Sequence, residues 1–197
     1  MNSIRYIPDP DYYVATKDRP PSDFLVEAVG MLGPNQKAAL DFGCGAGSET
    51  NFLLEHGFQV TAVDSNQDSE EYIMRLPHSE KVKFICTDFE HFSFGSYNLV
   101  NSARSLSFIH KDAFEDVLQK LIASITPGGL LVGDFYGIHD DWNQPDETMR
   151  FVDKVYVKSL FKDLNIIKLH EIEKDSRLAT GDQKHIHLFT FLAQKVS

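Results

Sequence analysis

Short apolar runs alternate with amphipathic segments along most of this 197-residue chain. Residues 38–42 form an apolar run of strand length, and residues 48–56 follow with helical spacing that ends at Gly57. The same alternation continues to residue 161. It predicts strands over 59–63, 82–86, 97–102 and 130–135, and helices over 69–76, 112–124 and 154–161.

The two ends of the chain depart from this alternation. Prolines cluster in residues 1–21, which predicts an irregular arm until Ser22 and Asp23 begin a helix. Pro127-Gly128-Gly129 predicts a turn before the strand at 130–135. Near the C-terminus, strands over 166–173 and 186–193 have only a turn-rich link between them, so we expect them to pair antiparallel.

Strand and helix in strict alternation indicate βαβ units, whose right-handed crossovers build a parallel sheet covered on both faces. The predicted fold class is therefore α/β: a Rossmann-like, doubly wound sheet of seven strands, mostly parallel, with one antiparallel strand near the C-terminus. The length fits one domain over residues 22–197, preceded by the arm at 1–21.

Composition and charge narrow the possible partners. A content of 42% hydrophobic and 24% charged residues is typical of a globular domain. The net charge of -10, without a run of Lys or Arg, disfavours nucleic acid. Since we find no export signal, no membrane-spanning apolar run and only two cysteines, Cys44 and Cys86, we expect a cytoplasmic protein without a disulfide framework or a membrane partner.

The strand at 38–42 runs into a loop that carries Gly43, Gly45 and Gly47 and opens the next helix. Glycines at such a point let the backbone turn tightly and let a ligand approach the main chain. Asp64 ends the next strand about 20 residues later, where a carboxylate can accept both hydroxyls of an adenosine ribose. Asp88 follows the strand after that. Together these residues predict a nucleotide site at the carboxyl edge of the sheet.

The glycine spacing helps to choose the nucleotide. A dinucleotide fingerprint needs a glycine or alanine three positions after its second glycine, and Ser48 stands there instead. We find no Gly-Lys-Ser/Thr phosphate loop, and the chain is too short for a separate substrate domain. The pattern favours a cofactor with an adenosine but no diphosphate.

Five segments together resemble one family. They are Leu40-Asp41-Phe42-Gly43-Cys44-Gly45-Ala46-Gly47, Val63-Asp64, Thr87-Asp88-Phe89, Tyr97-Asn98-Leu99-Val100, and Leu121 through Pro127-Gly128-Gly129-Leu130. In this order they resemble the class I S-adenosylmethionine-dependent methyltransferases, and among these the small single-domain members of the methyltransferase type 11 and tellurite-resistance type. The resemblance covers nearly the whole chain. One departure is Asn98, where such proteins usually carry Asp at a commonly structural position.

The resemblance implies S-adenosyl-L-methionine as cofactor and an arm that folds over it. It implies that Asp41 orders the methionine end, the glycines lie under the cofactor, Asp64 holds the ribose, and Asp88 with Phe89 frames the adenine. The expected cofactor-binding residues are Arg19, which would meet the cofactor carboxylate, Asp41, Gly43, Cys44, Gly45, Gly47, Asp64, Ser65, Asp88, Phe89, Asn101, Ser102 and Ala103.

Methyl transfer from a sulfonium is a direct displacement in which the protein mainly aligns the reacting atoms, so no catalytic nucleophile is required. Candidates for a catalytic role are Arg104, His110 and His139. His110 equally suits a position just before a helix cap at Asp112. Candidates for acceptor contacts are Tyr13, Arg104 as a cation for an anionic acceptor, Tyr136 and Trp142.

Several of these residues also have a purely structural interpretation. Tyr13 suits a solvated arm, and Trp142 suits an anchor that pins the polar segment 137–150 to the body of the protein. His185 and His187 lie on one face of a strand, as a metal pair would, but no third ligand is evident from the sequence, so we expect no metal.

The predicted function is that of a methyltransferase with an unidentified small-molecule acceptor. Two alternatives stay open at this point: a catalytically idle S-adenosylmethionine-binding module or partner subunit, and an NAD-dependent oxidoreductase, which the glycine spacing disfavours. The sequence leaves the acceptor atom and the choice between monomer and homodimer open.

Overall fold

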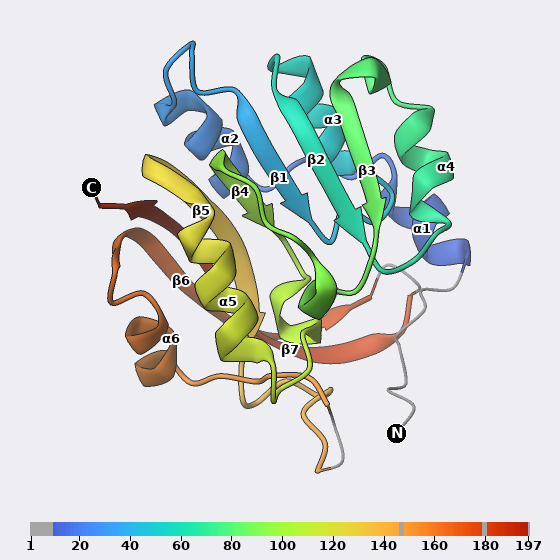
Figure 1. Ribbon diagram of the computed structural model, residues 1–197. Coiled ribbons are helices and arrows are strands. Elements are labelled where there is room, and N and C mark those ends of the chain that lie inside the picture. The colour runs from blue at the N-terminus through green and yellow to red at the C-terminus, as the bar shows by residue number, and fades with distance from the viewer. Residues whose placement is uncertain (1–9, 146–147, 179–180, 197) are drawn as a thin grey trace.

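A computed structural model of the protein describes residues 10–145, 148–178 and 181–196. It contains a seven-stranded sheet in the order β3-β2-β1-β4-β5-β7-β6 (Figure 1). The strands are β1 (Ala38–Phe42), β2 (Gln59–Asp64), β3 (Val82–Cys86), β4 (Tyr97–Ser102), β5 (Ile125–Tyr136), β6 (Leu164–Arg177) and β7 (Gln183–Lys195).

The direction of the strands agrees with the prediction. β1 pairs parallel with β2 and β4, and the parallel pairing continues to β3 on one side and β5 on the other. β7 is antiparallel to both of its neighbours, β5 and β6. It is therefore the one reversed strand of the sheet, and the predicted α/β class with a mostly parallel doubly wound sheet is confirmed.

Helices cover both faces of this sheet. The described helices are α1 (Pro10–Thr16), α2 (Asp23–Met31), α3 (Ser48–Glu55), α4 (Ser69–Met74), α5 (Phe114–Ala123) and α6 (Lys154–Leu160). In Figure 1, α5 lies in front of the sheet and α3 behind it. Buried apolar side chains form a separate core on each face, one with α5 and α6 and the other with α2 and α3. The rigid sheet between them fixes where the ends of its strands lie.

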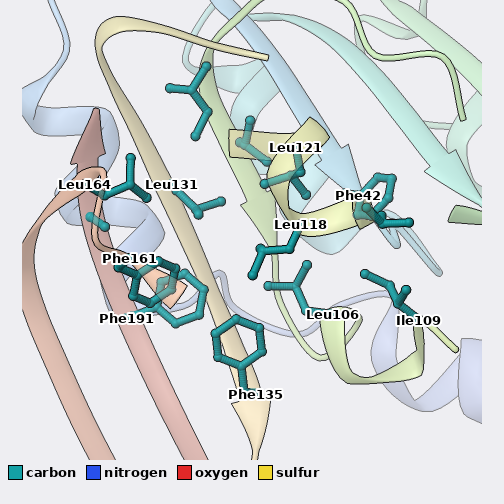
Figure 2. Packing of buried hydrophobic residues seen from close by; sticks show 14 of the residues in the cluster. Phe42, Leu106, Ile109, Leu118, Leu121, Leu131, Phe135, Phe161, Leu164 and Phe191 are labelled. Carbon is teal, nitrogen blue, oxygen red and sulfur yellow. The ribbon is translucent and has the colours of Figure 1, made fainter. Parts of the chain in front are cut away.

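The core around α5 is rich in aromatic rings. Phe135 of β5 stacks on Phe161 and on Phe191 of β7, with ring centroids 5.9 and 5.0 Å apart. Leu118 and Leu121 of α5 are almost completely buried against the same layer (Figure 2). Burying side chains of this size stabilises the fold by about 1.5–3 kcal/mol each, so this face anchors β4 and β5, whose carboxyl ends lead into candidate site residues.

Several details differ from the sequence prediction. The arm contains the short helix α1, whereas an irregular segment was expected; residues 1–9 of the arm lie outside the described part of the chain. The Pro127-Gly128-Gly129 segment belongs to β5, where Gly128 has φ +76° and the register against β4 shifts, so the expected turn is a bulge within a strand. β6 and β7 also continue beyond their predicted ends, because they pair with each other past the edge of β5.

The capping rules predict the start of one helix correctly and the start of another wrongly. Ser22 caps α2 as predicted, since its Oγ accepts a hydrogen bond from the N–H of Leu25 at 3.2 Å. The predicted cap at Asp112 is wrong: α5 begins at Phe114, and Ala113 occupies the cap position without a side-chain hydrogen bond.

Asn98, the residue that departs from the family pattern, joins three strands. Its Oδ1 accepts from the N–H of Ala38 at 3.1 Å, and its Nδ2 donates to the hydroxyl of Thr126 at 3.1 Å. An aspartate could accept at both positions but could not donate. The amide therefore preserves the structural role of the position with a different hydrogen-bond pattern.

Within the described residues, both cysteines are free thiols, Cys44 buried and Cys86 exposed. None of the helices in the described ranges combines the length and the apolar character needed to cross a bilayer.

Candidate functional site

The glycine loop between β1 and α3 is tied to the end of β2. The N–H groups of Gly43 and Cys44 both donate to the carbonyl oxygen of Val63, at 2.8 and 3.0 Å. Gly47 then occupies the cap position of α3, and its own N–H donates to Cys44 at 2.9 Å. The loop is thus held across the carboxyl ends of two neighbouring strands, which is where open α/β sheets bind ligands.

Gly43 and Gly45 each adopt a left-handed backbone, with φ +91° and +50°, but for different reasons. A Cβ on Gly43 would lie 2.3 Å from the Cβ of Ser105, so this glycine permits two chain segments to touch. A Cβ on Gly45 would meet no atom within 4 Å. Gly45 therefore presents bare main chain to open space, as a surface under a ligand would.

Asp64 faces this loop from the end of β2. Its Oδ2 accepts from the N–H of Gly45 at 2.9 Å and its Oδ1 from the N–H of Asn66 at 2.9 Å. Burial raises the pKa of Asp64, and these backbone donors oppose the rise. Each oxygen of an ionised carboxylate has a second lone pair, so a carboxylate oriented in this way can still accept from two hydroxyl groups.

Asp41 lies beneath the loop and is almost fully buried. Its two oxygens accept from the hydroxyl of Thr50 at 2.5 Å and from the amide of Asn101 at 2.9 Å. Burial, with the nearby charge of Glu49, raises the pKa of Asp41 to about 7. The Oδ1 of Asn101 is itself buried and has no hydrogen-bond donor among the described residues. Asp41 and Asn101 together give this end of the site an excess of acceptors.

Ser102, which follows Asn101, supports the loop from below. Its hydroxyl donates to the carbonyl oxygen of Phe42 at 3.1 Å and lies 2.6 Å from the hydroxyl of Ser105. Ala103 is half-buried in the turn that follows. Ser102 therefore acts on the glycine loop through Phe42 and Ser105.

The residues predicted to bind the adenosine beyond Asp64 lie in the turns after β2 and β3. Ser65 is half-buried, and its carbonyl oxygen lies 3.7 Å from the thiol of Cys86. Asp88 begins a short 3-10 helix, and its carboxylate lies 3.6 Å from Nδ1 of His91. The ring of Phe89 packs on Phe42 with centroids 4.1 Å apart, so it points into the core beneath the loop.

Helix α1 brings the N-terminal arm to this edge of the sheet. Tyr13 is almost fully buried, its ring stacks on Tyr72 of α4 at 5.0 Å, and its hydroxyl lies 3.1 Å from that of Ser69. Burial raises the pKa of Tyr13 to about 12, and Asp64 and Cys44 add to the rise through their charges. Arg19 is half-buried after the helix, where its N–H donates to Thr16.

On the other side of the loop, Arg104 is paired with acidic groups. Its Nη2 lies 2.8 Å from Oε1 of Glu49, and its backbone N–H donates to Oδ1 of Asp134 at 2.8 Å. Burial opposes its charge, but the carboxylates of Glu49 and Asp134 raise the pKa of Arg104. Its φ of +57° is a conformation that costs a non-glycine residue about 1 kcal/mol or more. The structure thus holds Arg104 in an internal ion pair.

Tyr136 and Trp142 belong to an aromatic cluster that anchors the segment after β5. Their ring centroids are 5.2 Å apart, and each also packs on Phe108. The ammonium group of Lys184 lies 4.4 Å from the ring of Tyr136 and 2.7 Å from Oδ1 of Asp140. Trp142 therefore contributes to fixing this segment, as its structural interpretation suggested.

The two candidate histidines lie in different surroundings. The N–H of His110 donates to Glu90 at 3.0 Å, and its Nδ1 accepts from the N–H of Asp112 at 3.3 Å. His139 lies against the β6–β7 hairpin, with Nδ1 3.2 Å from Oε1 of Glu173. The structure does not bring the two histidines together.

Sequence reasoning missed Glu49 and Asp134, the two buried acids beside Arg104. Asp134 carried a usable signal, because it interrupts the apolar run 130–135 that predicts a buried strand. Burial raises the pKa of Asp134 to about 6, and Arg104 opposes the rise. Glu49 lies in the first turn of a helix, where an acid is ordinary, so the sequence offers no comparable signal for it.

The part of the chain that carries the glycine loop resembles known proteins. Residues 39–129, which run from β1 into β5, match the profile of a family described as "Methyltransferase domain". The carboxy-S-adenosyl-L-methionine synthase of Actinobacillus succinogenes is 25% identical over 120 residues, 55% of this chain and 50% of that protein. The chain therefore spans about half the length of the curated relative that it matches.

Two solved structures share the fold over most of the chain. TehB from Haemophilus influenzae superposes with a TM-score of 0.75 at 19% identity, over 89% of this chain and 62% of TehB. The second is a 1,6-didemethyltoxoflavin-N1-methyltransferase of Burkholderia thailandensis, solved with 1,6-didemethyltoxoflavin and S-adenosylhomocysteine. Its TM-score is 0.64 at 20% identity, over 89% of this chain and 79% of that protein.

Proposed function

Residues 39–129 belong to the methyltransferase domain family within a class I S-adenosylmethionine-dependent methyltransferase fold, and from this we propose that the chain methylates a small-molecule acceptor. The observation that carries the proposal is the pairing of Asp64 with the N–H of Gly45, at 2.9 Å. It sets a carboxylate beside bare main chain at the carboxyl edge of the sheet. S-adenosylmethionine is the cofactor of this class, and it supplies a methyl group on a cationic sulfur.

The residues at the loop fit such a cofactor. Open space over Gly45 accommodates a ligand against the main chain. Asp64 retains lone pairs for two ribose hydroxyls. The buried Oδ1 of Asn101 is an acceptor for which an ammonium group is a suitable donor. The pKa of Asp41 beside it is raised to about 7 by burial, and a cationic cofactor bound there would favour its ionised form.

In the proposed reaction the protein acts by alignment and exclusion of water. Asp64 and the glycine loop orient the adenosine, while Asp41 and Asn101 hold the amino end. Helix α1, held by Tyr13 against α4, covers the cofactor from the side of the arm. Direct displacement needs the acceptor atom in line with the bond that breaks, and positioning of this kind accounts for much of a displacement barrier.

The charge beside Arg104 bears on the class of acceptor. The buried carboxylate of Glu49 pairs with the guanidinium group of Arg104, and the buried carboxylate of Asp134 accepts from the backbone N–H of Arg104, so an anionic acceptor would have to displace an existing ion pair beside a second acid. Tyr136 adds an aromatic wall close by. We therefore favour a neutral or cationic small molecule, in place of the anionic acceptor that the sequence alone suggested for Arg104.

Calorimetric titration of the wild-type chain and of Asp64→Ala with S-adenosylmethionine and S-adenosylhomocysteine tests the proposal. We expect the wild type to bind both ligands. The variant should lose about 1–3 kcal/mol of binding free energy, because hydrogen bonds to a charged carboxylate are lost.

Asp163→Asn is the matched control, since Asp163 is an exposed acid after α6, outside the proposed site. It should bind as the wild type does. No binding of either ligand by a folded wild-type chain at millimolar concentration would refute the proposal. Equal affinities of the wild type and Asp64→Ala would show that the ribose lies elsewhere.

A further inference from the structure

The distal half of the β6–β7 hairpin carries a ladder of acidic and imidazole side chains. The pairing of β5 with β7 ends at Tyr136 opposite Leu188, so the hairpin continues beyond the carboxyl end of β5 (Figure 1). In this extension Glu173 lies opposite His187, and Asp175 lies opposite His185. Because alternate residues share one face of a strand, all four side chains lie on the same face of the hairpin.

His139 adds a third imidazole from the segment after β5. Its Nδ1 lies 3.2 Å from Oε1 of Glu173, and its ring stacks on that of His187 with centroids 4.9 Å apart. Nε2 of His185 lies 3.5 Å from the same Oε1 of Glu173. One carboxylate oxygen is thus shared by imidazoles from two different segments.

The spacing of these atoms suits a metal ion. Zinc bonds to nitrogen and oxygen of about 2.0–2.2 Å separate the ligand atoms of a tetrahedral site by about 3.3 Å. The two contacts of Glu173 Oε1, at 3.2 and 3.5 Å, bracket that separation. One ligand atom from each of His139, Glu173 and His187 already lies within 4.8 Å of the others.

We propose that His139, Glu173 and His187, with His185 beside them, bind one divalent transition-metal ion of the zinc class. Imidazole and carboxylate ligands suit such ions. The exposed side chain of His139 has room to turn out of its stack on His187, so that both rings can direct a nitrogen toward one point. The site is independent of the proposed methyl transfer.

Acidic groups behind the imidazoles support this assignment. Nδ1 of His185 lies 2.7 Å from Oδ1 of Asp175, and Nε2 of His187 lies 3.4 Å from Oε1 of Glu171. A carboxylate that accepts from one ring nitrogen leaves the other as a lone-pair donor, which is the usual outer arrangement around metal-bound histidine. In His187 that other nitrogen, Nδ1, accepts from the backbone N–H of His139 at 3.2 Å, which ties the two ligand-bearing segments together before an ion binds.

The site would join two segments that are already connected by backbone hydrogen bonds from Gly137 to His187 and from Asp141 to His185. His139 belongs to the segment that also carries Trp142, whereas Glu173 and His187 belong to the hairpin. The side chains of His139 and Glu173 are exposed, so an ion can reach the cluster from solvent. A bound ion would therefore stabilise this part of the carboxyl edge.

The test is a calorimetric titration of the full chain, with any affinity tag removed, with Zn²⁺ and in parallel with Ni²⁺. We expect one ion per chain at micromolar affinity, accompanied by a rise in the thermal unfolding temperature that EDTA reverses. His139→Ala and Glu173→Gln should each weaken binding by at least about 10-fold. Both residues are exposed, so both variants should fold and keep the wild-type unfolding temperature in EDTA.

His78→Asn is the matched control. His78 is an exposed histidine far along the chain from the cluster, next to Glu80, and its φ of +63° is one that asparagine tolerates. This variant should bind the metal as the wild type does. The proposal would be overturned if the wild type did not bind either metal at concentrations up to about 100 μM. Unchanged affinity in Glu173→Gln would overturn it too. An equal loss in His78→Asn would show that binding is nonspecific, and would overturn it as well.

Discussion

Gly43 and Gly45 belong to one motif, but each position requires glycine for a different physical reason. Both have a positive φ, but Gly43 is surrounded by protein and Gly45 faces open space. The sequence predicts the motif from spacing alone and cannot separate the two roles, because Ser105 comes from a segment more than sixty residues away. The two roles can be told apart only in the folded chain, where β1 and β4 pair side by side.

Alanine substitutions should distinguish these roles. Gly43→Ala places a Cβ 2.3 Å from Ser105 in a left-handed conformation, and should lower the free energy of unfolding by about 2–4 kcal/mol. Gly45→Ala should cost only about 1 kcal/mol through its backbone, yet it should weaken binding of S-adenosylhomocysteine. Urea unfolding and calorimetry measure the two effects. Equal losses of stability in the two variants would contradict the assignment.

The buried carboxyl of Asp41 should make stability depend on pH. Burial raises its pKa from 3.8 to about 7 in the folded chain, so between these values the folded state holds a proton that the unfolded state has lost. Its contribution to stability is therefore most favourable below about pH 4 and declines until about pH 7.

Asp41→Asn should remove this decline, because asparagine does not titrate. The difference in unfolding free energy between the wild type and the variant should shift against the wild type by on the order of 3–4 kcal/mol from about pH 4 to pH 7. Chemical unfolding at a series of pH values measures that difference. A difference that stays constant across the range would mean that Asp41 is ionised throughout.

At the scale of elements, the parallel part of the sheet was predictable and its extensions were not. Runs such as 38–42, 82–86 and 97–102 predicted β1, β3 and β4 with the same limits that the structure shows. β1 and β4 are central strands that are mostly buried between two layers of helices, whereas β3 lies at the edge of the sheet and is only partly buried. The outer half of the β6–β7 hairpin is polar and exposed, and its pairing depends on the partner strand more than on its own pattern.

The same contrast explains the unexpected helix α1. Its seven residues, which begin at Pro10, are too few to show a helical period, and the cluster of prolines favoured an irregular arm instead. It is stabilised by tertiary contacts, chiefly the burial of Tyr13 against Tyr72 and Ser69. A short helix of this kind is marginal in isolation and depends on its docking surface.

Substitutions of Tyr13 test whether α1 covers the cofactor. Tyr13→Ala removes the stack on Tyr72 and should weaken binding of S-adenosylhomocysteine by about 3- to 10-fold, the equivalent of one aromatic contact. Tyr13→Phe is the control, since it keeps the ring and loses only the hydroxyl contact with Ser69. It should bind nearly as the wild type does. Unchanged affinity in Tyr13→Ala would remove α1 from the site.

At the scale of the whole molecule, the resemblance in five short segments predicted the methyltransferase domain family that residues 39–129 match and the fold that a solved methyltransferase shares with this chain. Three of those segments, at residues 40–47, 63–64 and 87–89, lie at the carboxyl ends of β1, β2 and β3, where the order of the sheet brings them to one edge. The acceptor side was less predictable. Its acids Glu49 and Asp134 come from different elements and meet Arg104 only in the folded chain, which changes the expected acceptor from an anion to a neutral or cationic molecule.

The central claim is that the glycine loop and Asp64 hold the adenosine of S-adenosylmethionine. A crystal structure of the chain with S-adenosylhomocysteine tests it most directly. We predict both ribose hydroxyls within hydrogen-bond distance of the Asp64 carboxylate and the ligand against the main chain of Gly45. A ligand bound at another edge of the sheet, or crystals that stay free of it at saturating concentration, would contradict the account.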